Sequence, residues 1–488
     1  MQQIKLPKLR KIDPDKPKRK KKKILLLSDD LRLHSGIGTM SKEFVIGTVD
    51  KYDWVQVGAA INHPDQGKCF DLSEETQKVT GVEDASVKIY ANNGYGNPQL
   101  LYYLLETEKP DAILHFTDPR FWGWLYQMED QLRQHIPLMY YNIWDDLPYP
   151  QWNEDFYESC DLLMNISKQT NNIVKNVLKR YPKEDWAVQY VPHGINEKFY
   201  KPITPLDNDY KEYHEFDKTF RLKNNNAEFV VFWNNRNIRR KQPGDVILAY
   251  KTFCDSLPKE KAEKCLLLMH TQPRDDNGTD LPAVKRALCN DYNITFSGVG
   301  IDDKQLNYYY NIADVTINIA SNEGFGLSGA ESLMAGTPII NNVTGGLQDH
   351  CRFEDENGKW IDFTPEFPTN HLGRYKKHGK WVKPVFPSNI SCQGSPQTPY
   401  IFDDRCDFRD VAKAIKYWYD MGRDNRKEHG MAGHDWVCSE ESGMSAREMS
   451  NGFIKHMEIC FEKWKPRKRF KLYKVEQVPI NETPGVLV

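Results

Sequence analysis

The stretch SNEGFGLSGAESLMAGTP, residues 321–338, combines two glutamates with closely spaced glycines. The apolar run before it, residues 315–319, is typical of a buried strand, and residues 327–335 are typical of a helix. Glu323 would therefore lie in the loop at the carboxyl end of a strand, where open α/β sheets bind their ligands. Glu331, separated from it by seven residues, would lie about one turn inside the helix.

The loop between the two glutamates has the composition of an anion site. Gly324, Gly326 and Gly329 allow backbone N–H groups to approach a ligand closely, with Phe325 and Leu327 between them. The positive end of the helix dipole would lie at the same place, and this combination suits a diphosphate. We therefore predict donor-binding residues at 324–327.

Short apolar runs alternate with helical stretches on both sides of this motif. We predict strands at 24–28, 54–60, 112–116, 138–143, 162–166 and 188–191, and again at 229–233, 265–270, 294–296, 315–319 and 337–341. Such alternation is typical of doubly wound parallel sheets. At 488 residues the chain is too long for one ordinary core, so we expect two α/β domains.

The composition along the chain suggests where these domains begin and end. We expect a basic disordered tail at 1–23, a first domain at 24–200, a linker at 201–226, a second domain at 227–444 with an irregular insertion at 352–405, a helical segment at 445–474 that crosses back to the first domain, and a tail at 475–488.

The motif at 321–338, continuing through Gly336-Thr337-Pro338, resembles the signature of the large retaining glycosyltransferase family with the GT-B fold, which includes glycogen-synthase-like and mannosyltransferase enzymes. The resemblance implies two Rossmann-like domains that face each other across a cleft. It also implies that Glu323 contacts hydroxyls of a donor sugar and that Glu331 holds the nucleotide ribose.

Basic residues follow the first strand of the predicted second domain. Arg236 and Lys241, five residues apart, resemble the family's pair that neutralises the donor diphosphate. A departing nucleoside diphosphate gains negative charge in the transition state, so cations are needed there. A solvated basic loop is the structural alternative for these residues.

In the first domain, Gly36 and Gly38 resemble the family's glycine-rich loop, although a dinucleotide-type G-x-G-x-x-G is not completed because residue 41 is Ser41. His115 lies in a segment that resembles a family motif with a histidine beside the donor sugar. Asp118 and Asp145 are weaker candidates for the acceptor side of the cleft. No plausible metal motif is recognised, so we expect neither metal nor cofactor besides the nucleotide sugar.

The resemblance implies retention of configuration, for which we expect front-face displacement, and it implies an envelope glycan or lipid-linked sugar, the commonest choice in the family, as acceptor. Eleven Lys/Arg in residues 1–23 and seven in 463–474 leave open an anionic partner, such as DNA, an acidic glycan or a membrane surface. A viral-type transferase acting on hydroxylated DNA bases is therefore one alternative, and an inactive GT-B binding subunit is another. A GT-B sugar-nucleotide epimerase or a glycan phosphorylase fits the motifs less well.

The bulk composition agrees with a soluble enzyme. Charged residues make up 27% of the chain, and no stretch approaches the roughly 20 apolar residues that a transmembrane helix needs. Ten scattered cysteines without a framework spacing indicate reduced thiols. We therefore expect a cytoplasmic protein, with peripheral contact at a membrane surface as an alternative.

Overall fold

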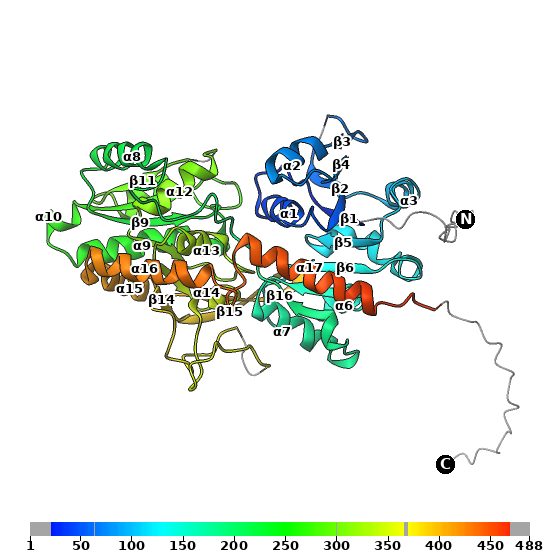
Figure 1. Cartoon of the computed structure of the whole chain (residues 1–488). Helices are drawn as coiled ribbons and strands as arrows, with labels where there is room; N and C mark the ends of the chain where they lie inside the picture. Colours follow the sequence, from blue (N-terminus) through cyan, green and yellow to red (C-terminus); the bar gives the residue numbers. More distant parts are fainter. Residues whose placement is uncertain (1–20, 63, 299, 366–368, 469–488) are drawn as a thin grey trace, which may run out of the picture.

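The computed structural model describes residues 21–62, 64–298, 300–365 and 369–468. Two α/β lobes lie side by side (Figure 1). The basic residues expected in the two tails at 1–20 and 469–488 lie outside the described part of the chain. At the boundary, Lys22 and Lys23 already belong to the first strand rather than to a tail.

The first lobe is built on one sheet whose strand order is β3-β4-β2-β1-β5-β6-β7-β8. All of its neighbouring pairs are parallel except β3 with β4. The elements are β1 (Lys22–Asp29), α1 (Gly36–Ile46), β2 (Tyr52–Ile61), β3 (Cys69–Asp71), α2 (Ser73–Thr80), β4 (Val87–Asn93), α3 (Pro98–Thr107), β5 (Ala112–Phe116), η1 (Pro119–Trp122), α4 (Gly123–Tyr126), α5 (Glu129–Leu132), β6 (Leu138–Asn142), η2 (Gln151–Asn153), α6 (Glu154–Glu158), β7 (Leu162–Asn165), α7 (Lys168–Val177), η3 (Leu178–Arg180), η4 (Asp185–Ala187) and β8 (Val188–Tyr190). The strand order reverses between β1 and β5, which is the switch point of a doubly wound sheet.

The second lobe contains a parallel sheet with the order β11-β10-β9-β12-β13-β14. Its elements are β9 (Phe229–Asn234), η5 (Arg239–Lys241), α9 (Pro243–Asp255), α10 (Lys259–Ala262), β10 (Cys265–His270), α11 (Leu281–Leu288), β11 (Ile294–Phe296), α12 (Asp303–Ile312), β12 (Val315–Asn318), α13 (Leu327–Met334), β13 (Ile339–Asn342), α14 (Leu347–Cys351), β14 (Val382–Val385), α15 (Phe408–Met421) and α16 (Arg423–Val437). Here the order reverses between β9 and β12. The predicted fold class, two doubly wound α/β domains, is confirmed.

The last described helix, α17 (Ala446–Lys463), runs from the second lobe across the first (Figure 1). Phe453 of this helix stacks on Phe44 of α1 with ring centroids 4.6 Å apart. Tyr52 of β2 donates a hydrogen bond to Glu458 at 2.8 Å. The apolar face of α17 is therefore buried against the first domain.

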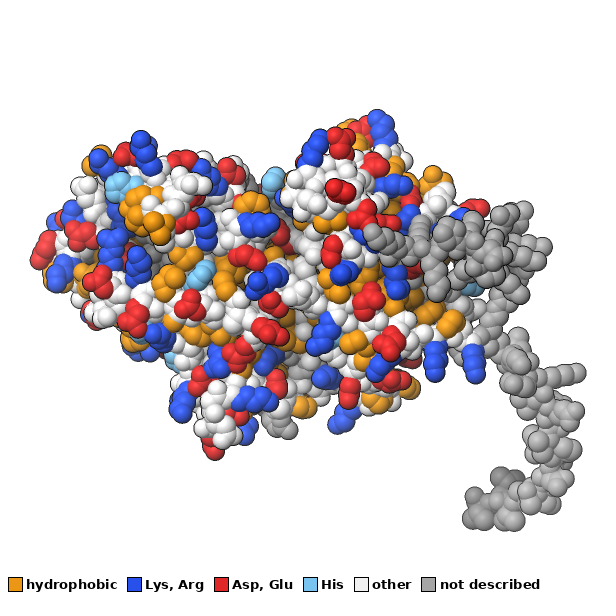
Figure 2. Space-filling view, viewed as in Figure 1, with side chains coloured by type: hydrophobic (Ala, Val, Ile, Leu, Met, Phe, Trp, Pro, Cys, Tyr) orange, Lys and Arg blue, Asp and Glu red, His pale blue; other side chains and the backbone are white. Residues whose placement is uncertain are grey.

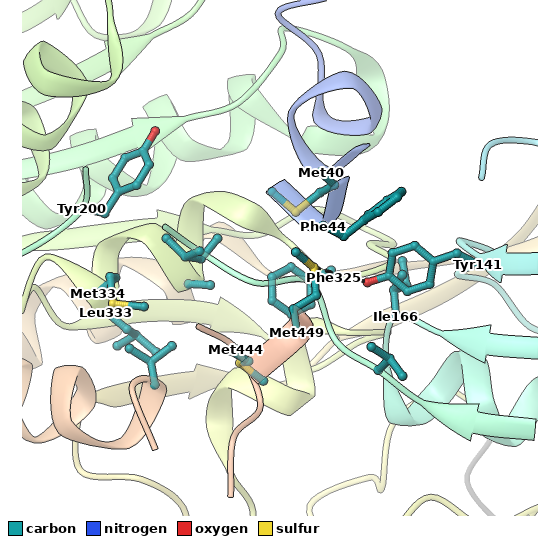
Figure 3. Close-up of a cluster of buried hydrophobic side chains, with 14 of the residues drawn as sticks. Met40, Phe44, Tyr141, Ile166, Tyr200, Phe325, Leu333, Met334, Met444 and Met449 are labelled. Atoms are coloured by element: carbon teal, nitrogen blue, oxygen red, sulfur yellow. Dashed lines mark hydrogen bonds between the residues drawn. The ribbon is translucent and has the colours of Figure 1, made fainter. Parts of the chain in front are cut away.

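One buried apolar cluster joins the two lobes (Figure 3). Met40, Phe44 and Tyr141 contribute from the first domain, and Phe325 and Leu333 from the second. Figure 2 shows a notch between the two lobes at the top of the view. In the described part of the chain, no helix is both long and apolar enough to cross a membrane.

The segment predicted as an irregular insertion, 352–405, is more ordered than its sequence suggests. Residues 382–385 form β14, the edge strand of the second sheet, in parallel register with β13. The strands β15 (Asn389–Ser395) and β16 (Thr398–Arg405) form an antiparallel hairpin. Their mixed polar composition hides both features, because the hairpin has few buried positions and β14 contains Pro384.

The segment predicted as a linker, 201–226, contains the helix α8 (Tyr210–Lys223). Phe216 lies 5.4 Å from Tyr308 of α12, ring to ring, so the helix packs on the second lobe. Its other face is polar, and this explains why the composition resembles that of a linker.

Candidate active site

The loop between β12 and α13 carries Glu323 at the switch point of the second sheet. Its conformation depends on Gly326, which caps α13 with a φ of 87°, in the left-handed region. A Cβ on Gly326 would lie 2.5 Å from Leu347, so both backbone angle and space require glycine. The sequence predicts Gly326 as a point of close approach for an anion and does not predict this backbone requirement.

Glu323 is buried between two cations. Lys241 pairs with both of its carboxylate oxygens, and Arg240 pairs with one of them. Burial alone would raise the pKa of Glu323, but Lys241 and Arg240 outweigh it and hold that pKa at about 2. Burial lowers the pKa of Lys241, and the positive charge of Arg240 lowers it further, so that it lies at about 8. The three side chains thus form a charged group in which Glu323 and Lys241 are buried and Arg240 is half-buried.

Arg236, the predicted partner of Lys241, lies elsewhere in this conformation. Its side chain is 63% exposed, and its Nε donates to Asp275 at 3.0 Å. The structure instead brings Arg240 to Glu323, and Arg240 also donates to the carbonyl of Asn322 at 2.8 Å. Sequence reasoning missed Arg240, although the run Arg239-Arg240-Lys241 was a signal that more than one cation lies there.

Glu331 lies on α13 beside the last turns of α12. Tyr310 donates a hydrogen bond to its carboxylate at 2.6 Å, and Asn234, at the end of β9, donates to the Tyr310 hydroxyl at 2.8 Å. Burial raises the pKa of Glu331 to about 7, with the Tyr310 hydrogen bond opposing it and Asp303 adding to it. The carboxylate is held in one orientation at the switch point between β9 and β12.

The start of α1 faces the start of α13 across the two domains. Ser35 caps α1 by accepting a hydrogen bond from the Gly38 N–H at 3.1 Å. A Cβ on Gly36 would lie 3.5 Å from Leu327, the first residue of α13. Neither helix has an acidic residue in its first turn, so both positive ends are uncompensated from within the helix. Two helix N-termini that converge in this way favour an anion between them.

His115 lies in the core of the first domain. Its Nδ1 is 2.7 Å from the Tyr126 hydroxyl, and its ring stacks on Tyr140 at 4.9 Å. The side chain is fully buried, and burial lowers its pKa to about 3. A sugar cannot reach this imidazole in the described conformation, and the structure does not group it with Glu323.

Asp145 does lie beside the charged group. Gly324 packs against it closely enough that a Cβ there would be 3.6 Å from the Asp145 Cβ. Burial raises the pKa of Asp145, while Arg240 lowers it and Glu323 raises it further. Asp118, by contrast, caps the short helix η1 and pairs with Arg120, whose Nε lies 2.9 Å from its carboxylate.

The hairpin β15–β16 connects the Glu323 loop to the first domain. Asp403 accepts hydrogen bonds from Ser321 at 3.0 Å and Asn322 at 3.3 Å. On the other side, Tyr400 packs on Trp152 with centroids 4.5 Å apart, and the Phe402 N–H donates to the Leu147 carbonyl at 2.7 Å. The hairpin therefore spans both domains next to the site, which its sequence did not reveal.

Among the described side chains, no group of three or more His, Cys, Asp or Glu could hold a metal ion. The charges that the site offers to an anionic ligand are instead the two helix N-termini with Arg240, Lys241 and Arg236. Two of the acidic side chains near them, Glu323 and Asp403, have partners within the protein.

No protein-family model matches the chain. A curated protein, the alpha-monoglucosyldiacylglycerol synthase of Acholeplasma laidlawii, is 28% identical over 166 residues, which make up 32% of this chain and 36% of that protein. The chain thus matches little more than a third of the length of this curated relative.

Solved structures match over nearly the whole chain. HepE (Alr3699) of Anabaena, in complex with UDP and glucose, is 12% identical with a TM-score of 0.60, covering 90% of this chain and 100% of HepE. The sucrose-phosphate synthase of Thermosynechococcus elongatus is 15% identical with a TM-score of 0.60, covering 91% of this chain and 100% of the synthase. Two doubly wound domains with the motif at 321–338 between them, together with these likenesses, show that the chain has the GT-B fold of the nucleotide-sugar glycosyltransferases.

Proposed function

We propose that the protein is a retaining glycosyltransferase that moves a sugar from a UDP-sugar to an acceptor hydroxyl. The observation that carries the proposal is the meeting of the two helix N-termini, at Gly36 and Leu327, beside the buried group of Glu323, Lys241 and Arg240. The likeness to HepE, solved with UDP-glucose as well as with UDP and glucose, supports UDP as the nucleotide.

The second domain would hold the donor. By resemblance to the family, Glu323 contacts the sugar hydroxyls and Glu331 the ribose, and the donor diphosphate lies at the start of α13 between residues 324 and 327. Tyr310 and Asn234 fix the orientation of Glu331 for this role. Lys241 and Arg240 would be shared between Glu323 and the diphosphate, and Arg236 would leave Asp275 to join them.

The reaction would be a front-face displacement. The acceptor oxygen forms a bond to the anomeric carbon on the face from which the UDP oxygen departs, and the acceptor proton passes to the departing phosphate. The diphosphate gains charge as its bond to the sugar breaks, and preorganised donors aimed at that charge lower the barrier. Helix dipoles and cations would supply this stabilisation without a metal ion.

The first domain would then hold the acceptor, and α17 with the β15–β16 hairpin would keep the two domains in register. We propose a hydroxyl of a glycan or lipid-linked sugar as the acceptor, in line with the family resemblance.

The test is nucleotide release from UDP-glucose, UDP-galactose, GDP-mannose and ADP-glucose by the full chain. Arg236→Ala and Glu331→Gln are expected to lower kcat/KM for the preferred donor at least tenfold. Arg239→Ala is the matched control, because Arg239 is also exposed, lies three residues from Arg236 and should not affect the rate. If no nucleotide sugar binds in calorimetry, the proposal fails and an inactive binding subunit becomes the better interpretation.

A further inference from the structure

Three strands of the first sheet, β1, β5 and β4, end at the same edge, and the switch point lies between β1 and β5. β1 ends at Asp29, β5 is followed by Thr117, and the loop after β4 carries Tyr95. The loop that leaves Asp29 leads to Gly36, which faces Leu327 at the proposed diphosphate site. Ligands of open α/β sheets bind at the carboxyl ends of strands near such a switch point. This edge of the first sheet therefore lies on the side of the first domain that faces the proposed donor site.

Two aromatic side chains at this edge stack on each other. The rings of Tyr95 and Phe121 are 4.6 Å apart between centroids, with their planes inclined by only 9°. Phe121 remains 52% exposed. Trp124 donates from its Nε1 to the Tyr95 carbonyl at 3.2 Å and so holds the loop in place. The pair presents a fixed apolar face outside the core.

Asp29 supplies a polar group next to this pair. Its Oδ1 atom is buried without a hydrogen-bond partner. Burial raises the pKa of Asp29 to about 6, and the neighbouring Thr117 opposes that rise. The Asp30 N–H donates to the Ala59 carbonyl at 3.0 Å, and the Ala60 N–H donates to the Gly94 carbonyl at 3.2 Å. The segments that follow β1, β2 and β4 are therefore hydrogen bonded in turn at this edge, with Asp29 at one end of the series and Tyr95 at the other. Leaving a buried carboxylate oxygen unsatisfied costs stability, and a ligand hydroxyl would remove that cost.

We propose that Asp29, Tyr95 and Phe121 form an acceptor platform that holds a sugar ring. The C–H face of a pyranose would pack on the aromatic face, and one ring hydroxyl would donate to Asp29 Oδ1. Aromatic faces carry partial negative charge and attract the weakly positive C–H groups of such a ring. The inference rests on the proposed glycosyltransferase function and names the acceptor class for that function.

The charges of these loops favour a sugar over a nucleic acid. A base could also stack on aromatic rings, but its phosphates would need free cations. Arg120 is engaged by Asp118 and by the Gln397 carbonyl at 3.1 Å. Arg32 donates twice to Asp30, at 2.9 and 2.7 Å. An uncharged ring with hydroxyl groups needs neither arginine and matches the carboxylate of Asp29.

The experiment measures sugar transfer from UDP-glucose to p-nitrophenyl glycosides of glucose, galactose and mannose, with Tyr95→Ala, Phe121→Ala and Asp29→Asn. Saturation-transfer NMR on the same glycosides reports binding without turnover. Tyr103→Ala is the matched control, because Tyr103 is 53% exposed in the same domain and likewise contacts one aromatic neighbour, Tyr90. We expect at least a tenfold increase in KM for the glycoside in the three platform variants and less than a twofold change in the control.

The platform is refuted if all platform variants keep KM within twofold of wild type. It is also refuted if the wild-type chain binds no glycoside of the panel, or if it modifies only an oligonucleotide or a lipid hydroxyl. UDP affinity, measured by calorimetry on wild type, separates this failure from that of the proposed function. A chain that binds UDP but no glycoside refutes the platform alone, whereas a chain that binds no UDP refutes both.

Discussion

Glu323→Gln is expected to destabilise the second domain, because the substitution leaves two cations without their carboxylate. Glu323 is 7% exposed and Lys241 6%, so water cannot replace the lost partner. Removing one partner of a buried ion pair costs about 3–5 kcal/mol. The Arg240 side chain is 39% exposed and can recover part of its hydration, which favours the lower end, about 3 kcal/mol.

For a domain of about 200 residues this free energy corresponds to a fall in Tm of roughly 6–12 °C. Circular dichroism melting of the full chain without nucleotide measures it. Glu323→Gln combined with Lys241→Met removes the stranded cation as well, so the double variant should recover to within about 1 kcal/mol of wild type. Asp420→Asn, which breaks an exposed pair with Lys416, should cost less than about 0.5 kcal/mol.

The reasoning is refuted if Glu323→Gln melts within about 1 °C of wild type, since the loss of the carboxylate that is hydrogen bonded to both Lys241 and Arg240 should cost more than that. A double variant that is no more stable than the single one would contradict it too. In that case the stability lost would come from packing of the loop rather than from an unpaired Lys241.

Three further predictions concern the backbone, the pH dependence and metals. Gly326→Ala should lower the unfolding free energy by about 2 kcal/mol or more and weaken UDP binding, because the new Cβ would collide with Leu347. Gly244→Ala is the control and should not destabilise the protein, because its Cβ would enter open space in α9. Equal melting temperatures of the two variants would argue against the proposed role of the turn. Glu331 has a folded pKa of about 7, above its ordinary value of 4.5, so the native state binds more protons and loses stability as pH rises from 4.5 to 7. Urea titrations of the unfolding free energy at pH 4.5 and pH 7 should show that Glu331→Gln removes up to about 3 kcal/mol of this pH-dependent loss. If the unfolding free energies of wild type and Glu331→Gln fall in parallel with pH, the raised pKa is not that of Glu331. EDTA should leave UDP release from UDP-glucose unchanged within twofold; a tenfold fall restored by Mn²⁺ would show a metal requirement.

The strands of both sheets were largely predictable, and the reason is local. Residues 112–116 and 265–270 are apolar apart from one histidine in each run, they are bounded by polar residues, and each forms a buried strand with those bounds. By contrast, β4 and β14 were missed, because alternating polar residues or a proline break their apolar pattern. The pairing of β14 with β13 depends on contacts between segments about 40 residues apart.

The candidate site divides in the same way. Glu323, Glu331 and the glycine turn were recognised because they lie within eleven residues of one another and follow one strand. The sequence did not predict which basic residue forms an ion pair with Glu323. Residues 236–241 contain four basic side chains, and all of them are more than 80 positions from Glu323 in the chain. The short helix η5 at 239–241 turns Arg240 and Lys241 inward and leaves Arg239 exposed.

The sequence by itself determined the fold class and predicted an anion site at 324–327, because apolar runs, glycines and helix starts act over a few residues. Only the tertiary structure decided that Arg240 rather than Arg236 lies on Glu323, that His115 is enclosed by aromatic rings, and that the 389–405 hairpin joins the domains. These outcomes depend on burial and on distances of a few ångströms between remote segments, and charge interactions change steeply with both.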